Sequence, residues 1–584
     1  MLEIFKPLMR RVHFEVPPRD LCQHKLEMAE AKQEELDEGV KEAQNRVDEA
    51  IEELEKRKVE AAENRGRIEV LKELMEKCIT DNGDQTKPTI GKWIPPGPVN
   101  CEILEAVCWE GELQIYGFLH TQIVPKKPKF PRKFENQSNV FMIILDSTST
   151  GSAHRMLPKS LKFLSEELEA VEFPYVNRVG ENSQSNGIPL IFGKQTEPVS
   201  NAKYGGIDEK EDWKIEKMCP IPVDNQTNLY EEFRNFGYMT MDHETMVNYP
   251  DCAGFSSPPT DHHLHSFESI LEDYGEMITK QHLSSDKCRE MHHVDFEYLQ
   301  KFIDAYPDQP KFSVLWMSDL SHDFFNGLAK FDSFFIKFLK KNLEVLSTSF
   351  LFILGDHGLR LVNQQGMENT ELFNFEKNNP FLTISIPQKY RKNSGILEKM
   401  RENSRQLQTH FDTRATVLDV LKYQPLSSFS STSLLKIPNE RGNSLLRTQP
   451  NHPRTCGRLP IPNGYCICRI QREQVNDPLL LKKYGRGLIS HVNSQLELSN
   501  VTSKCHLHQF SMTTSLIRLS RGNFEVSVLA KEPSHAHFQS TVFDDNKGKL
   551  VYGGVTRLDV YGRKGFCVKT SELERLCHCK NYRE

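Results

Sequence analysis

The stretch Phe352-Ile353-Leu354-Gly355-Asp356-His357-Gly358-Leu359-Arg360 is an apolar run that ends in adjacent carboxylate and imidazole side chains. Short apolar runs bounded by turn residues are typical of strands buried on both faces of a parallel sheet. Residues Val140 to Asp146 repeat this form, and Ser147 follows. Because ligand sites in such sheets lie beyond the carboxyl ends of the strands, Asp146, Asp356 and His357 are predicted to meet at one metal site. Oxygen and imidazole ligands suit zinc or manganese better than calcium. The alternative from these residues alone is a loop aspartate beside a surface histidine.

The composition restricts the class of protein. The chain has 584 residues, which allows one large domain with additions. A net charge of -6 gives no reason to expect a nucleic-acid partner. No window approaches 18 uninterrupted apolar residues, so we expect no membrane span. Residues Met1 to Arg11 lack the apolar core and cleavage site of a signal peptide.

The cysteines indicate an oxidising compartment. There are 14, and half of them lie between Cys456 and Cys579, which favours disulfides. Zinc binding is the alternative, but Cys466-x-Cys468 and Cys577-x-Cys579 have one intervening residue where zinc ligand pairs usually have two to four. Glycosylation sequons begin at Asn136, Asn225 and Asn500. We therefore expect a secreted glycoprotein although this chain shows no signal peptide; a cytoplasmic protein or a mis-joined gene model is the alternative.

The sequence divides into four predicted parts: a helical segment at 1–80, short strands with a basic, proline-rich linker at 81–138, a catalytic-type domain at 139–425 and a Cys-rich region at 426–584. In the first part, apolar or small residues recur every seven positions from Val40 to Met75. This pattern is typical of a coiled coil and suggests self-association. A solvated long helix or a helical hairpin that folds back on the body is the alternative.

The third part alternates predicted helices and strands. We expect helices at Leu161 to Ala170 and Asp412 to Leu421, and buried strands at Ser313 to Met317 and Ser349 to Leu354. This alternation predicts an α/β fold with a mostly parallel central sheet. The Cys-rich region, with strand-like runs between 511 and 555, is predicted to be a small, disulfide-linked β structure.

Several motifs occur in an order that resembles a known group of proteins. They are Asp146-Ser-Thr-Ser with the following Arg155-x-x-Pro158, Gly180-Glu-Asn-Ser183-Gln-Ser-Asn186, Pro259-Thr-Asp-His262, Ser321-His322-Asp323 and Asp356-His-Gly358. In this order the chain resembles the alkaline-phosphatase-like superfamily. More closely, from about Asn139 to Cys579, it is similar to an uncharacterised sulfatase-like family of invertebrate animals described only as a domain of unknown function.

The resemblance implies an alkaline-phosphatase-like sandwich and a set of site residues. Asp146, Asp356 and His357 would bind the metal, together with Ser183 as the nucleophile at the N-terminus of a helix. Metal coordination is a natural way to activate a hydroxyl, whose own pKa lies far above 7. His322 would contact the substrate or the leaving group, and Asn186 and Arg155 would help to bind it.

The resemblance also bears on the number of metal ions. Two-metal relatives carry Asp four residues before His, whereas Asp319 stands three before His322. We therefore expect one ion, whether zinc, manganese or calcium. Asp319 and His410 would be the candidates for a second ion, although a helix-start histidine is the alternative for His410.

The predicted reaction follows from Ser183. Sulfatases of this superfamily have a modified Cys at that position, so Ser183 favours phosphate over sulfate esters as substrates. The expected partner is an anionic ester, which could be linked to a glycan or a lipid. The alternative is a catalytically silent, secreted binding or structural protein, because Thr150, Ser185 and His265 replace residues that the relatives usually carry.

Overall fold

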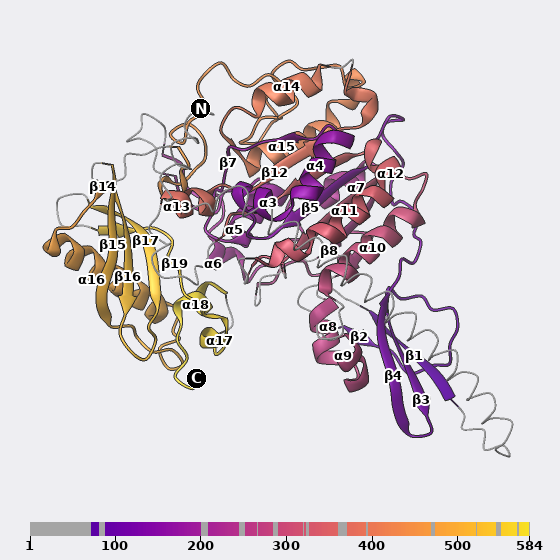
Figure 1. The fold of residues 1–584 in the computed structure, drawn as a ribbon, viewed down its shortest axis with the longest axis horizontal. Helices are drawn as coiled ribbons and strands as arrows, with labels where there is room; N and C mark the ends of the chain where they lie inside the picture. Colours follow the sequence, from indigo (N-terminus) through magenta and orange to yellow (C-terminus); the bar gives the residue numbers. More distant parts are fainter. Residues whose placement is uncertain are drawn as a thin grey trace, which may run out of the picture. The chain divides into compact units, whose positions relative to one another are not determined.

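The computed structural model describes residues 72–80, 88–199, 208–243, 252–264, 267–283, 290–318, 320–322, 326–359, 371–392, 395–468, 473–520, 523–544, 550–568 and 571–582 (Figure 1). The chain forms two compact units, Met1–Lys72 and Glu73–Glu584, and the described residues belong to the second apart from Lys72. The heptads of the predicted coiled coil lie almost entirely outside the described residues.

The centre of the second unit is a seven-stranded sheet in the order β6-β12-β11-β5-β10-β8-β9. Neighbouring strands from β11 to β9 are parallel, whereas β12 is antiparallel to both β11 and β6. The predicted α/β fold with a mostly parallel central sheet is therefore confirmed. The strands are β5 (Val140–Leu145), β6 (Val171–Glu172), β8 (Met239–His243), β9 (His262–Leu264), β10 (Lys311–Met317), β11 (Phe350–Leu354) and β12 (Leu382–Ser385).

The apolar runs fill both faces of this sheet because successive side chains of a strand point to opposite sides. Met142 and Phe352 lie in one core cluster, and Ile143 and Ile353 lie in the other. Helices α5 (Ser183–Phe192), α7 (Leu229–Asn235), α14 (Ile396–Asn403) and α15 (His410–Lys422) contribute to the first cluster. Helices α3 (Thr150–Met156), α4 (Pro158–Glu167), α8 (Phe267–Tyr274), α10 (Met291–Ala305) and α11 (Asp332–Lys341) contribute to the second.

The two predicted helices are present with shifted boundaries. The first, α4, begins at Pro158, a residue that suits the first turn of a helix because it needs no N–H partner there. The second, α15, begins at His410 behind a capping box formed by Thr409 and Asp412. Shorter elements of the body are α6 (Ile215–Met218), α9 (Met277–Leu283), α12 (Leu343–Ser347), α13 (Glu371–Asn378), β7 (Val176–Asn177) and β13 (Gln408–Thr409).

The prediction of a helical segment at 1–80 is wrong for its last residues. Residues Lys72–Thr80 form β1, which joins β2 (Thr89–Ile90), β3 (Ile103–Glu110) and β4 (Leu113–Thr121) in a four-stranded sheet. Cys78 forms a disulfide with Cys101, and the Lys77 ammonium lies 2.8 Å from the buried Glu105 carboxylate. These tertiary contacts override the local preference of the sequence for a helix.

The C-terminal region is the expected β structure. Strands β14 (Glu473–Gln474), β15 (Phe510–Ser520), β16 (Asn523–Ala530), β17 (His537–Asp544) and β18 (Leu550–Tyr552) form one sheet, and β19 (Thr556–Arg557) pairs with β17. Helix α16 (Pro478–Leu498) packs on it, and α17 (Gly562–Gly565) and α18 (Ser571–Leu576) follow. Before this region begins, Phe429, Ile437 and Leu445 still lie in the main core, beyond the predicted boundary at 425.

Disulfides join most of the cysteines in the described residues. The pairs are Cys78–Cys101, Cys219–Cys252, Cys456–Cys466, Cys505–Cys577 and Cys567–Cys579. The disulfide interpretation is therefore confirmed over the zinc alternative at the Cys-x-Cys pairs, except that Cys468 is a free thiol. Among the described helices, none combines the length and the apolar character needed to cross a membrane.

Candidate active site

The predicted metal ligands come together at the carboxyl ends of two neighbouring strands. Asp146 directly follows β5 and Asp356 lies two residues after β11, which pairs with β5 in parallel. One carboxylate oxygen from each aspartate and one ring nitrogen of His357 lie within 4.8 Å of one another. All three side chains are buried. The ends of these two strands therefore bring Asp146, Asp356 and His357 together, as the sequence pattern predicts.

Ser183 completes this cluster. It is the first residue of α5, whose N-cap Asn182 accepts a hydrogen bond from the Ser185 amide at 3.0 Å. The Ser183 hydroxyl donates to Asp146 Oδ2 at 3.0 Å and lies 3.2 Å from His357 Nε2. The helix N-terminus also gives this position a partial positive charge, which favours an anion next to the hydroxyl.

Hydrogen bonds from the backbone fix Asp356 and His357. Asp356 Oδ1 accepts from the amides of Ser147 and His357, both at 2.8 Å. The Gly358 carbonyl can only accept, so its 2.7 Å contact makes His357 Nδ1 the protonated nitrogen. The Nε2 lone pair therefore faces Ser183 and Asp356 Oδ2, which is 3.4 Å away.

The charges at this point favour a cation. Asp356 Oδ2 is buried and has no hydrogen-bond partner. Burial and the neighbouring Asp146 carboxylate raise the pKa of Asp356. Two carboxylates and an imidazole lone pair that share a buried space are the donor set of a divalent metal site. Asp146, Asp356 and His357 can therefore hold a metal ion, with Ser183 beside it.

The segment after β10 also contacts Asp146. Ser321 donates to the Asp146 carbonyl at 2.5 Å and lies 3.1 Å from the Thr148 hydroxyl. His322, the predicted substrate contact, is the next residue and is half-buried. Asp319, the predicted second-metal candidate before it, lies outside the described residues.

His410 has a different place from the one predicted for a second metal ion. Its Nε2 donates to the Asp356 backbone carbonyl at 2.8 Å, so this nitrogen is occupied by the loop. Burial lowers the pKa of His410 to about 4, which keeps the ring neutral. His410 is absent from the candidate metal clusters of the described residues. His410 therefore stabilises the loop that carries Asp356 through this hydrogen bond to its backbone.

Two predicted substrate-binding residues are engaged elsewhere. The Asn186 amide accepts from the Val179 and Gly180 amides and donates to the Gly180 and Asn182 carbonyls, so it serves the turn before α5. The Arg155 guanidinium forms a two-pronged ion pair with Glu376 at 2.6 and 2.7 Å. In this structure Asn186 shapes the nucleophile turn and Arg155 is paired with Glu376, and the contacts of both residues with a substrate stay predictions.

The backbone beside Asp146 is strained, a feature that no motif in the sequence indicates. Ser147 has a positive φ of 56°, which is uncommon for a residue with a side chain. Its hydroxyl donates to Asp146 Oδ1 at 2.8 Å while its amide donates to Asp356. Ser147 thus connects the two carboxylates, and backbone strain of this kind clusters at functional sites.

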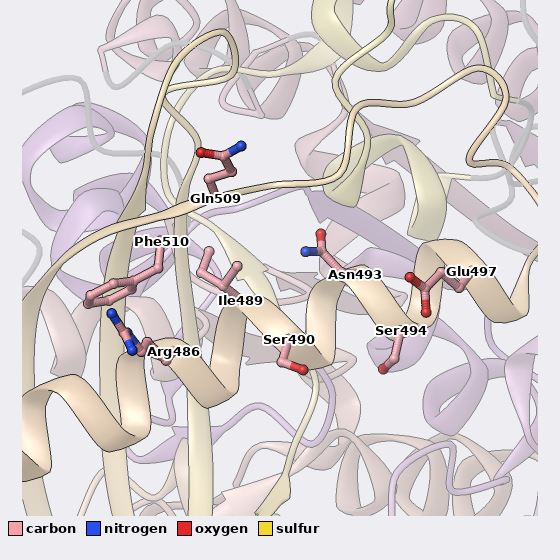
Figure 2. A pocket seen from close by; sticks show the side chains of 8 residues that line it. All are labelled: Arg486, Ile489, Ser490, Asn493, Ser494, Glu497, Gln509 and Phe510. Atoms are coloured by element: carbon pink, nitrogen blue, oxygen red, sulfur yellow. The ribbon is translucent and has the colours of Figure 1, made fainter.

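A groove of about 530 Å³ lies on α16, and Figure 2 shows the side chains that line it. Two of its polar side chains already bind the backbone, because the Asn493 side-chain amide bonds both backbone groups of His508 and the Ser494 hydroxyl donates to the His491 carbonyl. The lining residues are Arg486, Ile489, Ser490, Asn493, Ser494, Glu497, Gln509 and Phe510. None of them belongs to the metal cluster.

Comparisons with known proteins support the family resemblance. A family model described as "Protein of unknown function (DUF229)" matches residues 23–514. No curated protein matches the chain.

Solved structures with some likeness include three proteins from bacteria. A protein of the alkaline phosphatase superfamily from Vibrio parahaemolyticus has 11% identity and a TM-score of 0.32, with 78% of this chain and 88% of that chain covered. The C-terminal periplasmic domain of EcEptC from Escherichia coli has 12% identity and a TM-score of 0.34, with 59% and 94% covered. The phosphonate monoester hydrolase from Silicibacter pomeroyi has 12% identity and a TM-score of 0.35, with 71% and 90% covered. Since these TM-scores are low, the three structures assign no function to this chain.

Proposed function

We propose that this chain, which belongs to the DUF229 family, is a metal-dependent hydrolase or transferase that acts on phosphate esters, with sulfate esters as the alternative class of substrate. The observation that carries the proposal is the position of the Ser183 hydroxyl, 3.0 Å from Asp146 Oδ2 and 3.2 Å from His357 Nε2. This hydroxyl stands beside a set of metal-binding atoms at a helix N-terminus, where both a nucleophile and an anion are favoured.

Each residue has a role in this proposal. Asp146, Asp356 and His357 hold the ion, with zinc and manganese the best match to two carboxylates and an imidazole. A bound divalent ion would lower the pKa of a neighbouring hydroxyl and offset charge on a phosphoryl group. Asp146 Oδ2 accepts the hydrogen bond that orients the Ser183 hydroxyl. Ser183 attacks phosphorus and the bond to the ester alcohol breaks, so the proton lost by Ser183 is balanced by the proton that the leaving alcohol takes up. Water or another alcohol then removes the phosphoryl group from the phosphoserine and restores Ser183. His322, which follows Ser321 at the Asp146 carbonyl, contacts the substrate or the leaving group.

The substrate is an anionic ester, linked to a glycan or a lipid. The ion pair of Arg155 with Glu376 offsets the positive charge that the resemblance would supply for a substrate anion. This pairing favours a second candidate, a catalytically silent binding protein on the same fold.

Turnover measurements separate the two candidates. The purified protein is supplied with zinc or manganese and tested on aryl phosphate, phosphodiester and sulfate esters, beside Ser183→Ala. Turnover that is lost in Ser183→Ala supports the hydrolase. Equal turnover in both proteins would remove Ser183 as the nucleophile, and no turnover in either would favour the silent protein.

We also propose that the protein is secreted. Disulfides persist in oxidising compartments, and the described residues contain five of them. Asn225 and Asn500 are exposed, as glycan attachment requires, whereas Asn136 is half-buried. Mass spectrometry of the protein from animal cells should find glycans at Asn225 and Asn500; unmodified sites in a protein with free thiols would contradict secretion.

A further inference from the structure

A buried network connects the turn before Ser183 to the C-terminal sheet. Glu181 stands two residues before Ser183, and its backbone is held on both sides. Its amide donates to Glu197 Oε1 at 2.7 Å, and its carbonyl accepts from the Arg178 guanidinium at 2.7 Å. The turn is therefore fixed by side chains as well as by the helix cap.

The Glu181 carboxylate leaves the turn and contacts other parts of the chain. Oε1 accepts a hydrogen bond from the hydroxyl of Thr556 in β19, and Oε2 accepts one from the Tyr465 hydroxyl at 3.2 Å. Glu181 and Thr556 are 3% and 4% exposed, so water does not compete for this contact. A buried carboxylate that loses a hydrogen-bond partner destabilises the folded protein, so this contact favours one arrangement of the turn and β19.

A second contact joins the same sheet to the Asp-His-Gly loop. The Lys377 ammonium of α13 donates to Gln539 Oε1 of β17 at 2.7 Å and lies 3.5 Å from the Thr556 hydroxyl. The Lys377 carbonyl accepts from the amide of Gly358, the residue after His357, at 3.2 Å. Thr556 thus lies between Glu181 on the nucleophile side and Lys377 on the metal-ligand side.

We propose that the C-terminal sheet is part of the active site, with Thr556 and Gln539 as positioning residues that set the Ser183 turn against the Asp356–His357 loop. The inference rests on the proposed function for its catalytic meaning. Because catalysis falls steeply with small displacements of a nucleophile, loosening this junction lowers turnover more than it weakens substrate binding. The disulfide-linked C-terminal region is then needed for chemistry as well as for stability.

Three variants of the full-length protein test this proposal. Thr556→Val removes the hydroxyl at constant shape, and Thr556→Ser keeps it. Thr513→Val is the matched control, since the Thr513 hydroxyl donates to the Leu481 carbonyl within the same C-terminal region. Each protein is measured for thermal unfolding, for kcat and KM, and for hydrogen exchange of the Ser185 amide, which reports on the nucleophile turn.

We expect Thr556→Val to lower kcat by roughly tenfold with little change in KM, and to speed exchange of the Ser185 amide. Thr556→Ser should restore both, and Thr513→Val should leave both unchanged. The proposal is overturned if Thr556→Val and Thr513→Val show the same exchange and the same kcat. If the wild-type protein has no turnover on any ester, the proposed function fails, yet the exchange of the Ser185 amide still decides whether the sheet positions the turn.

Discussion

Replacing Asp356 by Asn should stabilise the metal-free protein, although most changes of buried residues destabilise. Asn can keep the oxygen that accepts from the Ser147 and His357 amides. It also removes a buried charge whose Oδ2 has no hydrogen-bond partner, beside a second carboxylate. A buried polar group without a partner costs about 1–3 kcal/mol, so the free energy of unfolding in chelator should rise by a similar amount at pH 8.

The same variant should lose stabilisation by metal. An ion at a hundred times its dissociation constant adds about 2.7 kcal/mol to a protein that binds it, and Asp356→Asn removes one ligand. The assay is urea unfolding with chelator and with saturating zinc or manganese. Burial raises the pKa of Asp356, so the wild-type residue takes up a proton as the pH falls and the difference between the two proteins should shrink.

Asp419→Asn is the matched control. Asp419 is equally buried, but the Arg447 guanidinium holds both of its oxygens at 2.8 Å. Its replacement should cost about 3–5 kcal/mol with or without metal, because a buried guanidinium then lacks its partner. If Asp356→Asn destabilises the metal-free protein as Asp419→Asn does, or if metal stabilises wild type and Asp356→Asn equally, Asp356 is neither an unfavourable buried charge nor a metal ligand.

Other substitutions test the surroundings of the site and the C-terminal region. Gly358→Ala would place a Cβ 1.7 Å from the Glu376 carbonyl, so we expect a loss of about 3 kcal/mol in urea unfolding and of metal-dependent stabilisation; wild-type behaviour would contradict this close approach. The double variant Asp419→Leu with Arg447→Met should recover most of the stability lost by Asp419→Asn, because it leaves no buried charge without a partner. If the double variant is less stable than Asp419→Asn, the unpaired buried guanidinium is not the cause of that loss. Burial lowers the pKa of His508 to about 4, so the unfolded chain gains a proton first as the pH falls, and this residue alone should contribute a loss of stability of about 1.4 kcal/mol per pH unit below pH 6.5, beside the contribution of His410. His508→Gln should make the slope between pH 7 and pH 5 less steep in unfolding curves, and an unchanged slope would assign it to other groups.

The features that the sequence predicted are those that depend on local pattern. The runs that became β5 and β11 are apolar throughout, and β10 is apolar apart from Lys311 and Ser313, because both faces of these strands are covered. Asp146, Asp356 and His357 follow from the same pattern, since parallel strands end at one edge of the sheet. Ser183 came from the family motif, because a serine at a helix start is common without any catalytic role.

The features that the sequence did not predict depend on partners far along the chain. Lys72–Thr80 is charged and helix-prone, and its conversion to a strand depends on Cys101 and Glu105. The pairing of Arg155 with Glu376 joins positions 221 residues apart, and the Thr556–Glu181 contact spans 375. Motif spacing carries no information about such partners, so the contacts of Arg155 and Glu181 within the protein could not be predicted from their motifs.

The strand-end origin of the cluster has a kinetic consequence. The bond between the Ser147 amide and Asp356 closes a stretch of 209 residues, so the binding atoms assemble only after β11 has docked beside β5. Contacts of such high sequence separation are slow to form and complete late on a folding pathway. An ion that binds there would therefore slow the unfolding limb of a chevron plot while leaving the refolding limb almost unchanged. The cation would therefore slow unfolding of the folded protein and would not speed the folding of a new chain.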